Sequence, residues 1–314
     1  MQATILTYDE NVALLSWAGV IAALRHGHRC PPPQQGDILL GGAQGQLLTR
    51  AAHIEGLGFA VKADSIFPGN ARFDRPSVQG AVLLYDPDFG AVQAIIESRL
   101  VTQYKTAADS VLGALCLARP DSRRLLIMGA GAVAETLARA YDAAFPGLAQ
   151  IAIWSRRPDQ AEALVERLGD LRAEVSATTE AAESAGRADI ISTATMARDP
   201  ILPGDWVRPG THVDLVGAFT PEMRESDDAL VAKSVVYVDF MGTVMDRIGD
   251  VMAPIASGAI PRDHIRGDLY ALLAPGGVHR SSAEQITLFK NGGGAHLDLM
   301  VAHHIAQVAA AARA

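Results

Sequence analysis

The residues with the clearest chemical meaning form a glycine-rich turn, Gly129-Ala-Gly131-Ala-Val-Ala134, directly after the apolar run 124–128. In such a turn the first glycine permits a sharp bend and the second lets a pyrophosphate approach the backbone. The small third residue lets strand and helix pack closely. A dinucleotide is therefore expected to bind at four residues, Gly129, Gly131, Ala132 and Val133. The alternative is a glycine turn with a purely structural role.

The next apolar segment, 150–155, ends in Ser155-Arg156-Arg157. An NAD-binding protein usually has Asp or Glu at this point, which accepts hydrogen bonds from the ribose hydroxyls. A serine hydroxyl and two guanidinium groups suit a ribose 2′-phosphate far better. The sequence thus favours NADPH as the cofactor, with NADH possible. The alternative is that Arg156 and Arg157 are solvated residues at a helix start.

Three cations stand in or beside apolar segments of the first third of the chain. Lys62 ends the run Gly58-Phe-Ala-Val-Lys62, and Arg50 follows Leu47-Leu-Thr. A cation in an apolar strand is costly to bury unless an anion meets it, which makes Lys62 a candidate anchor for an anionic substrate. The alternative for both residues is that they extend to water from an edge strand. Lys105, beside the apolar stripe of a predicted helix, could face a cleft or solvent.

Other polar residues are weaker candidates. No carboxylate or cysteine lies at ligand spacing from four histidines, so no metal site is predicted at His26, His28, His303 or His304. His296 and Asp298 are interpreted as capping or packing groups of the last helix, although an active-site role stays open. No Gly-x-Ser-x-Gly motif or Cys/His arrangement indicates covalent catalysis.

Elements of two different patterns must position these residues. Before residue 120, apolar segments alternate with turn clusters, which predicts an antiparallel meander with strands at 37–40, 46–54, 58–67, 78–85 and 91–97. Apolar residues at 3/4 spacing predict a helix over about 98–118, ended by Pro120, and Asp9 is expected to cap a helix over about 10–25. This is an α+β pattern.

After Pro120, strands alternate with helices, which predicts an α/β domain with a doubly wound parallel sheet of the Rossmann type. Strands are expected at 124–128, 150–155, 172–176, 189–193, 211–216 and 234–239, and helices at about 132–145, 158–169 and 178–186. The segment from about 286 shows no strand pattern and is expected to pack on the first domain. The predicted domains are 1–119 completed by 286–314, and 120–285.

Composition excludes several classes of protein. The chain has 314 residues, about twice the 150-residue prior for one domain, and 49% of them are hydrophobic. The 27 Lys and Arg against 35 Asp and Glu give a net charge of −8, which disfavours nucleic acid and anionic membranes as partners. Two cysteines, Cys30 and Cys116, cannot build a disulfide framework, and no run approaches the apolar length of a membrane span. We expect a cytoplasmic protein.

Taken together, the motifs resemble those of the ornithine cyclodeaminase/mu-crystallin family over nearly the whole chain. The matching segments are, in chain order, Gly58-Phe-Ala-Val-Lys62, Phe67-Pro-Gly-Asn70, Lys105-Thr-Ala-Ala-Asp109-Ser110, Gly129-Ala-Gly131, Ser192-Thr-Ala-Thr195, Asp199-Pro200, Val216-Gly-Ala218 and Thr287-Leu-Phe-Lys-Asn-Gly-Gly-Gly-Ala-His-Leu-Asp298. The resemblance implies that the first domain, with the C-terminal helix, binds substrate and forms a homodimer, and that the middle of the chain is the Rossmann domain.

The resemblance also implies roles for individual residues. Lys62 would hold a substrate carboxylate, Lys105 and Thr106 would face substrate or cofactor, and the nicotinamide half would lie near Thr195, Val216 and Asn291. Two positions depart from the family pattern. The usual Arg-Thr-Ala-Ala reads Lys105-Thr-Ala-Ala here, and Phe219 replaces the aspartate that cyclodeaminases have after Val-Gly-Ala. Cyclodeaminases need that carboxylate, so its absence argues against ornithine cyclisation.

The segment 216–225 is similar instead to that of the family's bacterial Δ1-pyrroline-2-carboxylate reductases of hydroxyproline catabolism. This similarity implies that NADPH reduces a cyclic ketimine carboxylate at C2, giving L-proline, or L-pipecolate from the six-membered ring. Lys62 would clamp the carboxylate, helped by Arg50 or Lys105, and Lys105 is the best candidate for protonating the imine nitrogen. The alternatives are an ornithine cyclodeaminase or alanine-type amino acid dehydrogenase, and a non-catalytic NADPH-dependent ligand-binding protein of the mu-crystallin type.

Overall fold

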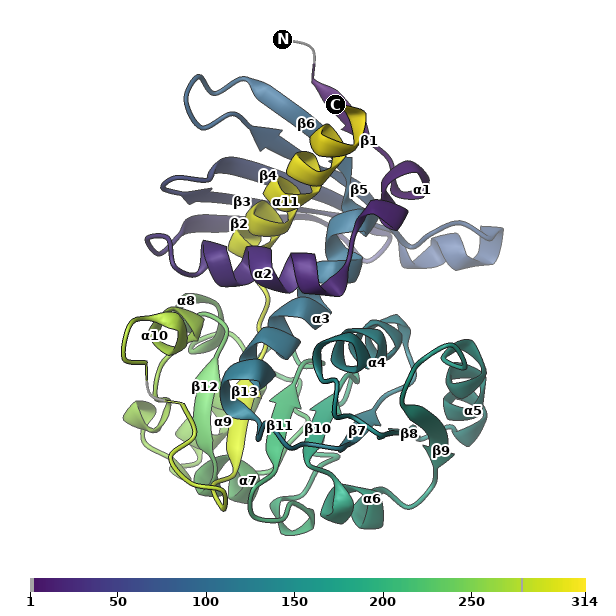
Figure 1. Cartoon of the computed structure of the whole chain (residues 1–314), viewed down its shortest axis with the longest axis vertical. Coiled ribbons are helices and arrows are strands. Elements are labelled where there is room, and N and C mark those ends of the chain that lie inside the picture. The colour runs from purple at the N-terminus through teal and green to yellow at the C-terminus, as the bar shows by residue number, and fades with distance from the viewer. Residues whose placement is uncertain (1–2, 278) are drawn as a thin grey trace. The chain divides into compact units, whose positions relative to one another are not determined.

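A computed structural model describes residues 3–277 and 279–314 (Figure 1). The chain divides into two compact units: unit 1 is Met1–Thr106 with Gly294–Ala314, and unit 2 is Ala107–Gly293. These boundaries differ from the predicted ones at 119 and 286. Helix α3 (Ser98–Leu117) passes from unit 1 into unit 2, and strand β13 (Thr287–Lys290) belongs to the sheet of unit 2.

Unit 1 contains a six-stranded sheet in the order β1-β6-β5-β4-β3-β2. Its strands are β1 (Thr4–Leu6), β2 (Gln34–Gly42), β3 (Gly45–Ile54), β4 (Gly58–Ile66), β5 (Val78–Tyr85) and β6 (Val92–Glu97). Strands β2 to β6 pair antiparallel, which confirms the predicted meander. β1 pairs with β6 in parallel and was not predicted, because three residues are too few to show an alternating pattern.

Helices cover one face of this sheet. Helix α11 (Ala295–Arg313) packs against β3, β4 and β5 and against helix α2 (Trp17–Gly27), as Figure 1 shows. The prediction of one helix over 10–25 was wrong. The chain forms α1 (Tyr8–Asn11) and a 3-10 turn (Val12–Leu14), and then starts α2 anew at Ser16, whose hydroxyl accepts a hydrogen bond from the backbone N–H of Gly19.

Strand register decides which side chains face α11. Lys62 of β4 lies opposite Arg50 of β3 and Val82 of β5. Directly opposed residues share a face and successive residues alternate. Residues 60, 62 and 64 of β4 are buried on the helix-covered face, while residues 59, 61, 63 and 65 point to the other face. The register therefore puts Arg50 and Lys62 side by side beneath α11.

Unit 2 contains a seven-stranded sheet in the order β12-β13-β11-β10-β7-β8-β9, with every pair parallel, which confirms the predicted Rossmann-type α/β sheet. Its other strands are β7 (Arg124–Met128), β8 (Gln150–Trp154), β9 (Glu174–Thr178), β10 (Ile190–Thr193), β11 (His212–Leu215) and β12 (Val235–Val238). The prediction that the segment after 286 has no strand was wrong: β13 lies between β11 and β12. All four of its residues are buried, so it shows no alternation.

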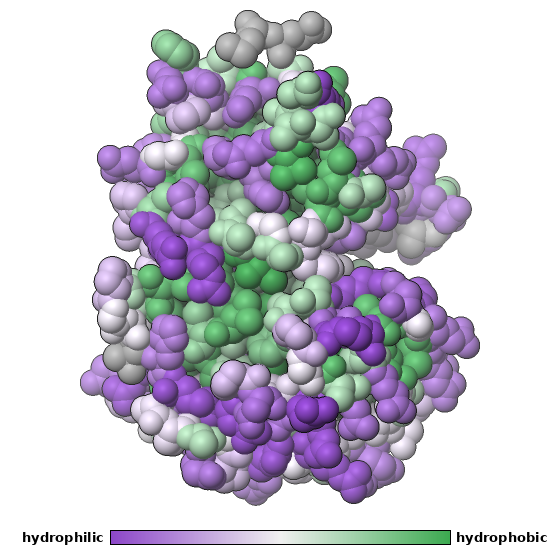
Figure 2. All heavy atoms as spheres, viewed as in Figure 1, coloured by the Kyte–Doolittle hydropathy of each residue, from purple (hydrophilic) through white to green (hydrophobic). Residues whose placement is uncertain are grey.

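The predicted helices of unit 2 follow the strands as expected: α4 (Ala132–Ala144), α5 (Pro158–Arg167) and α6 (Ala181–Arg187). The unit also contains α7 (Asp228–Lys233), α8 (Met241–Val244), α9 (Gly249–Ala256) and α10 (Leu269–Leu273). The apolar core lies on the sheet, around Leu126, Met128, Ile191, Val213 and Leu288. Hydrophilic residues make up most of the outline of both units in Figure 2. No helix in the described part of the chain is long and apolar enough to cross a membrane.

Candidate active site

The glycine turn has the geometry of a phosphate-binding loop. Gly129 has a φ of 136°, and a Cβ there would lie 2.4 Å from the carbonyl oxygen of Ala194, so only glycine fits. Gly131 precedes helix α4, and a Cβ built on it would meet nothing within 4 Å. Gly131, Ala132 and Val133 are exposed. The open space and free N–H groups at the start of a 13-residue helix suit a pyrophosphate.

Three polar residues follow the end of β8, where the ribose of a dinucleotide lies in a Rossmann fold. The hydroxyl of half-buried Ser155 accepts a hydrogen bond from the backbone N–H of Arg157, which precedes helix α5. Arg156 and Arg157 are exposed, and neither forms an ion pair with another residue described by the structure. Both guanidinium groups are thus available to an added anion.

The residues expected near the nicotinamide belong to loops at the carboxyl ends of neighbouring strands. Thr195 follows β10, and its N–H and hydroxyl both donate to Glu225. Val216 follows β11 and donates its N–H to the carbonyl of Thr193. Asn291 follows β13, and its side-chain amide donates to the hydroxyl of Ser110 at 3.0 Å. All three residues thus lie at the carboxyl ends of the strands, where open α/β sheets bind ligands.

Unit 1 holds a buried cluster of two lysines and one aspartate. The ammonium of Lys62 lies 3.1 Å, and that of Lys105 2.7 Å, from Oδ1 of Asp298. Asp64 is a more distant partner of Lys62, at 3.7 Å. Strand β4, helix α3 and helix α11 each supply one member of the cluster. Two ammonium groups share one carboxylate oxygen, and Oδ2 of Asp298 is buried without a hydrogen bond.

Arg50 stands beside this cluster on the same face of the sheet, but its guanidinium is engaged elsewhere. It forms an ion pair with Asp37 of β2 at 3.2 Å, and Asp37 lies directly opposite it in the strand register. Thr106 follows Lys105 on α3 and is half-buried. Two of the three predicted cations, Lys62 and Lys105, therefore share Asp298 as their ion-pair partner, whereas Arg50 pairs with Asp37.

Burial changes the proton affinity of this cluster. The pKa of Lys105 is lowered to about 7, chiefly because burial disfavours the charged ammonium; Asp298 opposes this shift, and the charges of Lys62 and Arg50 add to it. For Asp298, burial acts to raise the pKa, but the two lysines prevail and hold it below its usual value. Lys105 can therefore exchange a proton near neutral pH while Asp298 stays ionised.

Asp298, interpreted from the sequence as a capping or packing group with an active-site role left open, is the third member of the cluster. It lies in the first turn of α11, 236 residues after Lys62, and is fully buried. A signal was present: a carboxylate among the apolar residues of 295–301 needs a buried cation, by the same reasoning that singled out Lys62. The neighbouring His296 does have a packing role, because its ring lies edge-on against that of His28.

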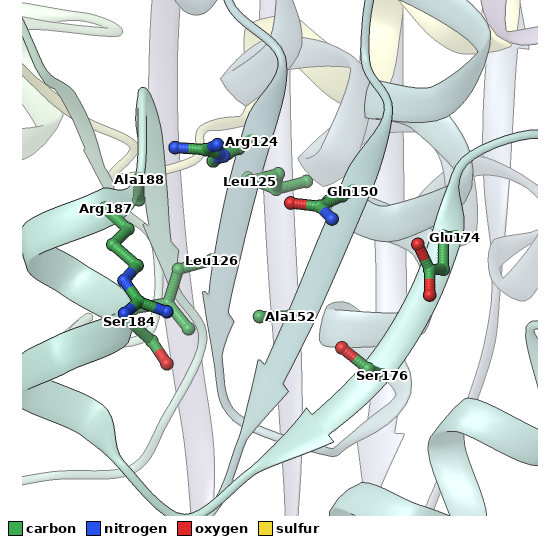
Figure 3. A pocket seen from close by; sticks show the side chains of 10 residues that line it. All are labelled: Arg124, Leu125, Leu126, Gln150, Ala152, Glu174, Ser176, Ser184, Arg187 and Ala188. Carbon is green, nitrogen blue, oxygen red and sulfur yellow. The ribbon is translucent and has the colours of Figure 1, made fainter.

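A hollow of about 460 Å³ in unit 2 lies away from these residues (Figure 3). It is lined by residues from the amino-terminal parts of the parallel strands β7, β8 and β9 and by residues in and just after α6. The lining side chains shown in Figure 3 are Arg124, Leu125, Leu126, Gln150, Ala152, Glu174, Ser176, Ser184, Arg187 and Ala188. Ligands of open α/β sheets bind at the opposite, carboxyl ends, so this hollow is not the candidate cofactor site.

The motifs and this geometry agree with the outcome of comparisons with known proteins. The sequence model described as the ornithine cyclodeaminase/mu-crystallin family matches residues 42–312. The chain belongs to this family. Membership confirms the resemblance seen in the motifs.

Three known proteins are similar to the chain along nearly its whole length. The chain is 53% identical over 305 residues to Δ1-pyrroline-2-carboxylate reductase of Paracoccus denitrificans, covering 97% of this chain and 96% of the relative. The Thermococcus litoralis Δ1-pyrroline-2-carboxylate reductase, solved with NADH and L-proline, matches with a TM-score of 0.90 and 30% identity over 99% and 98% of the two chains. An archaeal alanine dehydrogenase dimer with bound NAD matches with a TM-score of 0.91 and 25% identity over 100% and 98%.

Proposed function

We propose that the chain is an NAD(P)H-dependent imine reductase that converts Δ1-pyrroline-2-carboxylate to L-proline. The observation that carries this proposal is the 53% identity, along nearly the whole of both chains, to a Δ1-pyrroline-2-carboxylate reductase. Phe219 supports it, because cyclodeaminases have an aspartate at this position after Val-Gly-Ala. Δ1-Piperideine-2-carboxylate is a second proposed substrate, since one added methylene is discriminated only weakly.

The reaction adds a hydride to C2 of the imine and a proton to its nitrogen. A bound nicotinamide cofactor supplies the hydride. We infer that Lys62 binds the substrate carboxylate, exchanging part of its interaction with Asp298 for the new anion, with Arg50 adding positive charge from the next strand. We further infer that Lys105 donates the proton, because its pKa of about 7 makes it a usable acid near neutral pH.

For the cofactor, the exposed turn at Gly131 is proposed to hold the pyrophosphate. Ser155, Arg156 and Arg157 are proposed to bind a ribose 2′-phosphate, so that NADPH is preferred and NADH is used less well. The support is the absence of a carboxylate at the end of β8, where NAD-binding proteins usually have one. The nicotinamide half is proposed to lie near Thr106, Thr195, Val216 and Asn291.

We also propose a homodimer formed by the uncovered face of the unit 1 sheet. This face carries exposed apolar side chains on strands β2, β3 and β4, namely Ile38, Leu40, Leu47 and Phe59. Such a patch is costly to leave in water. The archaeal alanine dehydrogenase of the same fold is described as a dimer. The small number of cysteines, two in 314 residues, supports a reducing compartment such as the cytoplasm.

Steady-state kinetics test the proposal. The purified chain should oxidise NADPH in the presence of Δ1-pyrroline-2-carboxylate and form L-proline, with a lower kcat/KM for NADH. Lys62→Ala should raise the KM for the imine, and Arg156→Ala should raise the KM for NADPH but not that for NADH. Release of ammonia from ornithine would instead indicate a cyclodeaminase. NADPH binding without turnover of either imine would indicate a non-catalytic binding protein.

A further inference from the structure

Glu225 lies in unit 2 on the segment between β11 and α7 and makes an unusual number of hydrogen bonds. Its Oε1 accepts from the N–H of Thr195 at 2.8 Å and from the hydroxyl of Thr195 at 2.8 Å. Its Oε2 accepts from the hydroxyl of Thr193 at 2.7 Å and from the N–H of Gly217 at 2.6 Å. The residue is completely buried. One carboxylate thus ties the loop after β10 to the loop after β11.

These loops are packed too closely to move independently. A Cβ on Gly217 would lie 2.0 Å from the carbonyl oxygen of Thr195. The first of the two loops also supports the glycine turn, because a Cβ on Gly129 would lie 2.4 Å from the carbonyl oxygen of Ala194. Directly or through the loop after β10, Glu225 therefore supports three adjoining segments, which follow the carboxyl ends of β7, β10 and β11.

The backbone of Glu225 is itself held in place. Oδ1 of Asp250 accepts a hydrogen bond from the N–H of Glu225 at 2.7 Å, and the ammonium of Lys290 lies 3.1 Å from Oδ2 of Asp250. The carbonyl of Glu225 accepts from the N–H groups of Ile201 and Leu202. Asp250 and Lys290 are also fully buried, so the support is rigid.

We propose that Glu225 is a positioning residue for the nicotinamide half of the cofactor, acting through Thr195 and the loop that begins at Val216. Its side chain reaches neither cofactor nor substrate; it fixes the two loops so that the site is formed before the cofactor binds. The inference rests on the proposed function only in taking these loops as the nicotinamide site.

A carboxylate is needed because each of its two oxygens accepts a hydrogen bond from a backbone N–H. Glutamine at 225 would keep the size but turn an NH₂ group toward either Thr195 or Gly217, placing a donor against a donor. The expected result for Glu225→Gln is an NADH dissociation constant about tenfold higher, measured by NADH fluorescence, and a lower kcat. The KM for the imine should change little, because unit 1 supplies the proposed carboxylate anchor.

Asp189→Asn is the matched control. Asp189 is a buried carboxylate that precedes β10 and accepts hydrogen bonds from the N–H groups of Arg123 and Arg124, at the opposite end of the same strand. Loss of the Asp189 carboxylate should lower the melting temperature and leave the NADH dissociation constant unchanged. A dissociation constant and kcat within about twofold of wild type in Glu225→Gln would overturn the proposal. So would an equal weakening of NADH binding in Asp189→Asn.

A gentler variant serves if Glu225→Gln does not fold. Thr193→Val removes one hydroxyl donor, touches no proposed ligand and keeps the side-chain shape. NADH binding about fivefold weaker than wild type would support the proposal, and unchanged binding would contradict it. A wild-type protein that binds NADH but reduces neither imine would refute the proposed function, while the comparison of dissociation constants would still test Glu225.

Discussion

The ammonium of Lys105 lies 2.7 Å from Oδ1 of Asp298, the oxygen that Lys62 also approaches. An arginine at this position would stay protonated throughout the physiological pH range. The buried lysine has a pKa of about 7 and can lose its proton there. The arrangement thus gives the cluster a titratable cation and keeps a negative charge beside it.

The first prediction concerns the pH dependence of turnover. With a pKa of about 7, Lys105 carries its proton below that pH and loses it as the pH rises, so kcat for imine reduction should fall as the pH passes through about 7. In Lys105→Arg the fall should disappear and kcat should be lower throughout, because a guanidinium is a poor acid. The check is kcat measured from about pH 6 to 9. An identical pH profile in the variant would assign the fall to another group, such as the substrate iminium.

The second prediction concerns stability. Asp298→Asn should leave the buried ammonium of Lys105 without its counter-ion and that of Lys62 with only the more distant Asp64, which should lower the free energy of unfolding by about 3 kcal/mol at about pH 6. Because the folded-state pKa of Asp298 is lowered, its contribution is present above the unfolded-state pKa and is lost as the pH falls through the folded-state value. Urea denaturation should therefore show a smaller difference between wild type and variant in acid.

Asp170→Asn provides the control for that measurement. Asp170 also pairs with a cation, Arg139, at 2.8 Å, but the pair is exposed. Exposed ion pairs contribute little to stability. If Asp298→Asn proved as mild as Asp170→Asn, the buried cluster would not have the energetic importance inferred for it.

The third prediction separates two glycines of the same turn. Gly129→Ala should destabilise unit 2 by about 2 kcal/mol, because its backbone is left-handed and the methyl would clash with Ala194. Gly131→Ala should fold with nearly unchanged stability, since its methyl would meet no protein atom. It should nonetheless weaken NADPH binding about tenfold, because the methyl occupies the proposed pyrophosphate position. Thermal melts and cofactor titrations test the pair, and wild-type affinity in Gly131→Ala would exclude the turn as the phosphate site.

The fourth prediction concerns the dimer. Leu40 and Leu47 lie opposite each other in β2 and β3, 57% and 41% exposed, on the face that α11 does not cover. Light scattering should show wild type as a dimer, and Leu40→Lys should shift it toward monomer because a lysine is costly to bury between two sheets. Phe89→Lys, at an exposed turn between β5 and β6, should leave the oligomeric state unchanged. A Leu40→Lys protein that stays fully dimeric would place the interface elsewhere.

Sequence reasoning succeeded where the physics is local. Gly129 could be recognised because one residue must adopt a left-handed backbone between a strand and a helix, and the 13-residue helix that begins at Ala132 is visible in the sequence. The meander strands were visible from alternation. Lys62 stood out because a charge in an apolar strand demands an explanation, and its burial against Asp298 agrees with that reasoning.

The failures involve partners that are distant along the chain. Asp298 meets Lys62 across 236 residues, and only the docking of α11 on β4 brings them together. Strand β13 was missed because a central parallel strand is buried on both faces and Thr287-Leu-Phe-Lys290 has no alternation. The hydrogen bonds of Glu225 join the loops after β10 and β11, and the sequence of neither loop shows that the two meet in the fold.

The split of unit 1 across the chain has a consequence for biosynthesis. Strand β4 and helix α3 are made early, but the carboxylate that neutralises Lys62 and Lys105 is on α11, which follows the whole of unit 2. Unit 2 is completed almost as late, because β13 lies between β11 and β12 in its sheet and precedes α11 by only a few residues. On a translating ribosome, β4 and α3 therefore lack Asp298 until the last part of the chain emerges, and nascent unit 1 should depend on chaperone protection for most of synthesis.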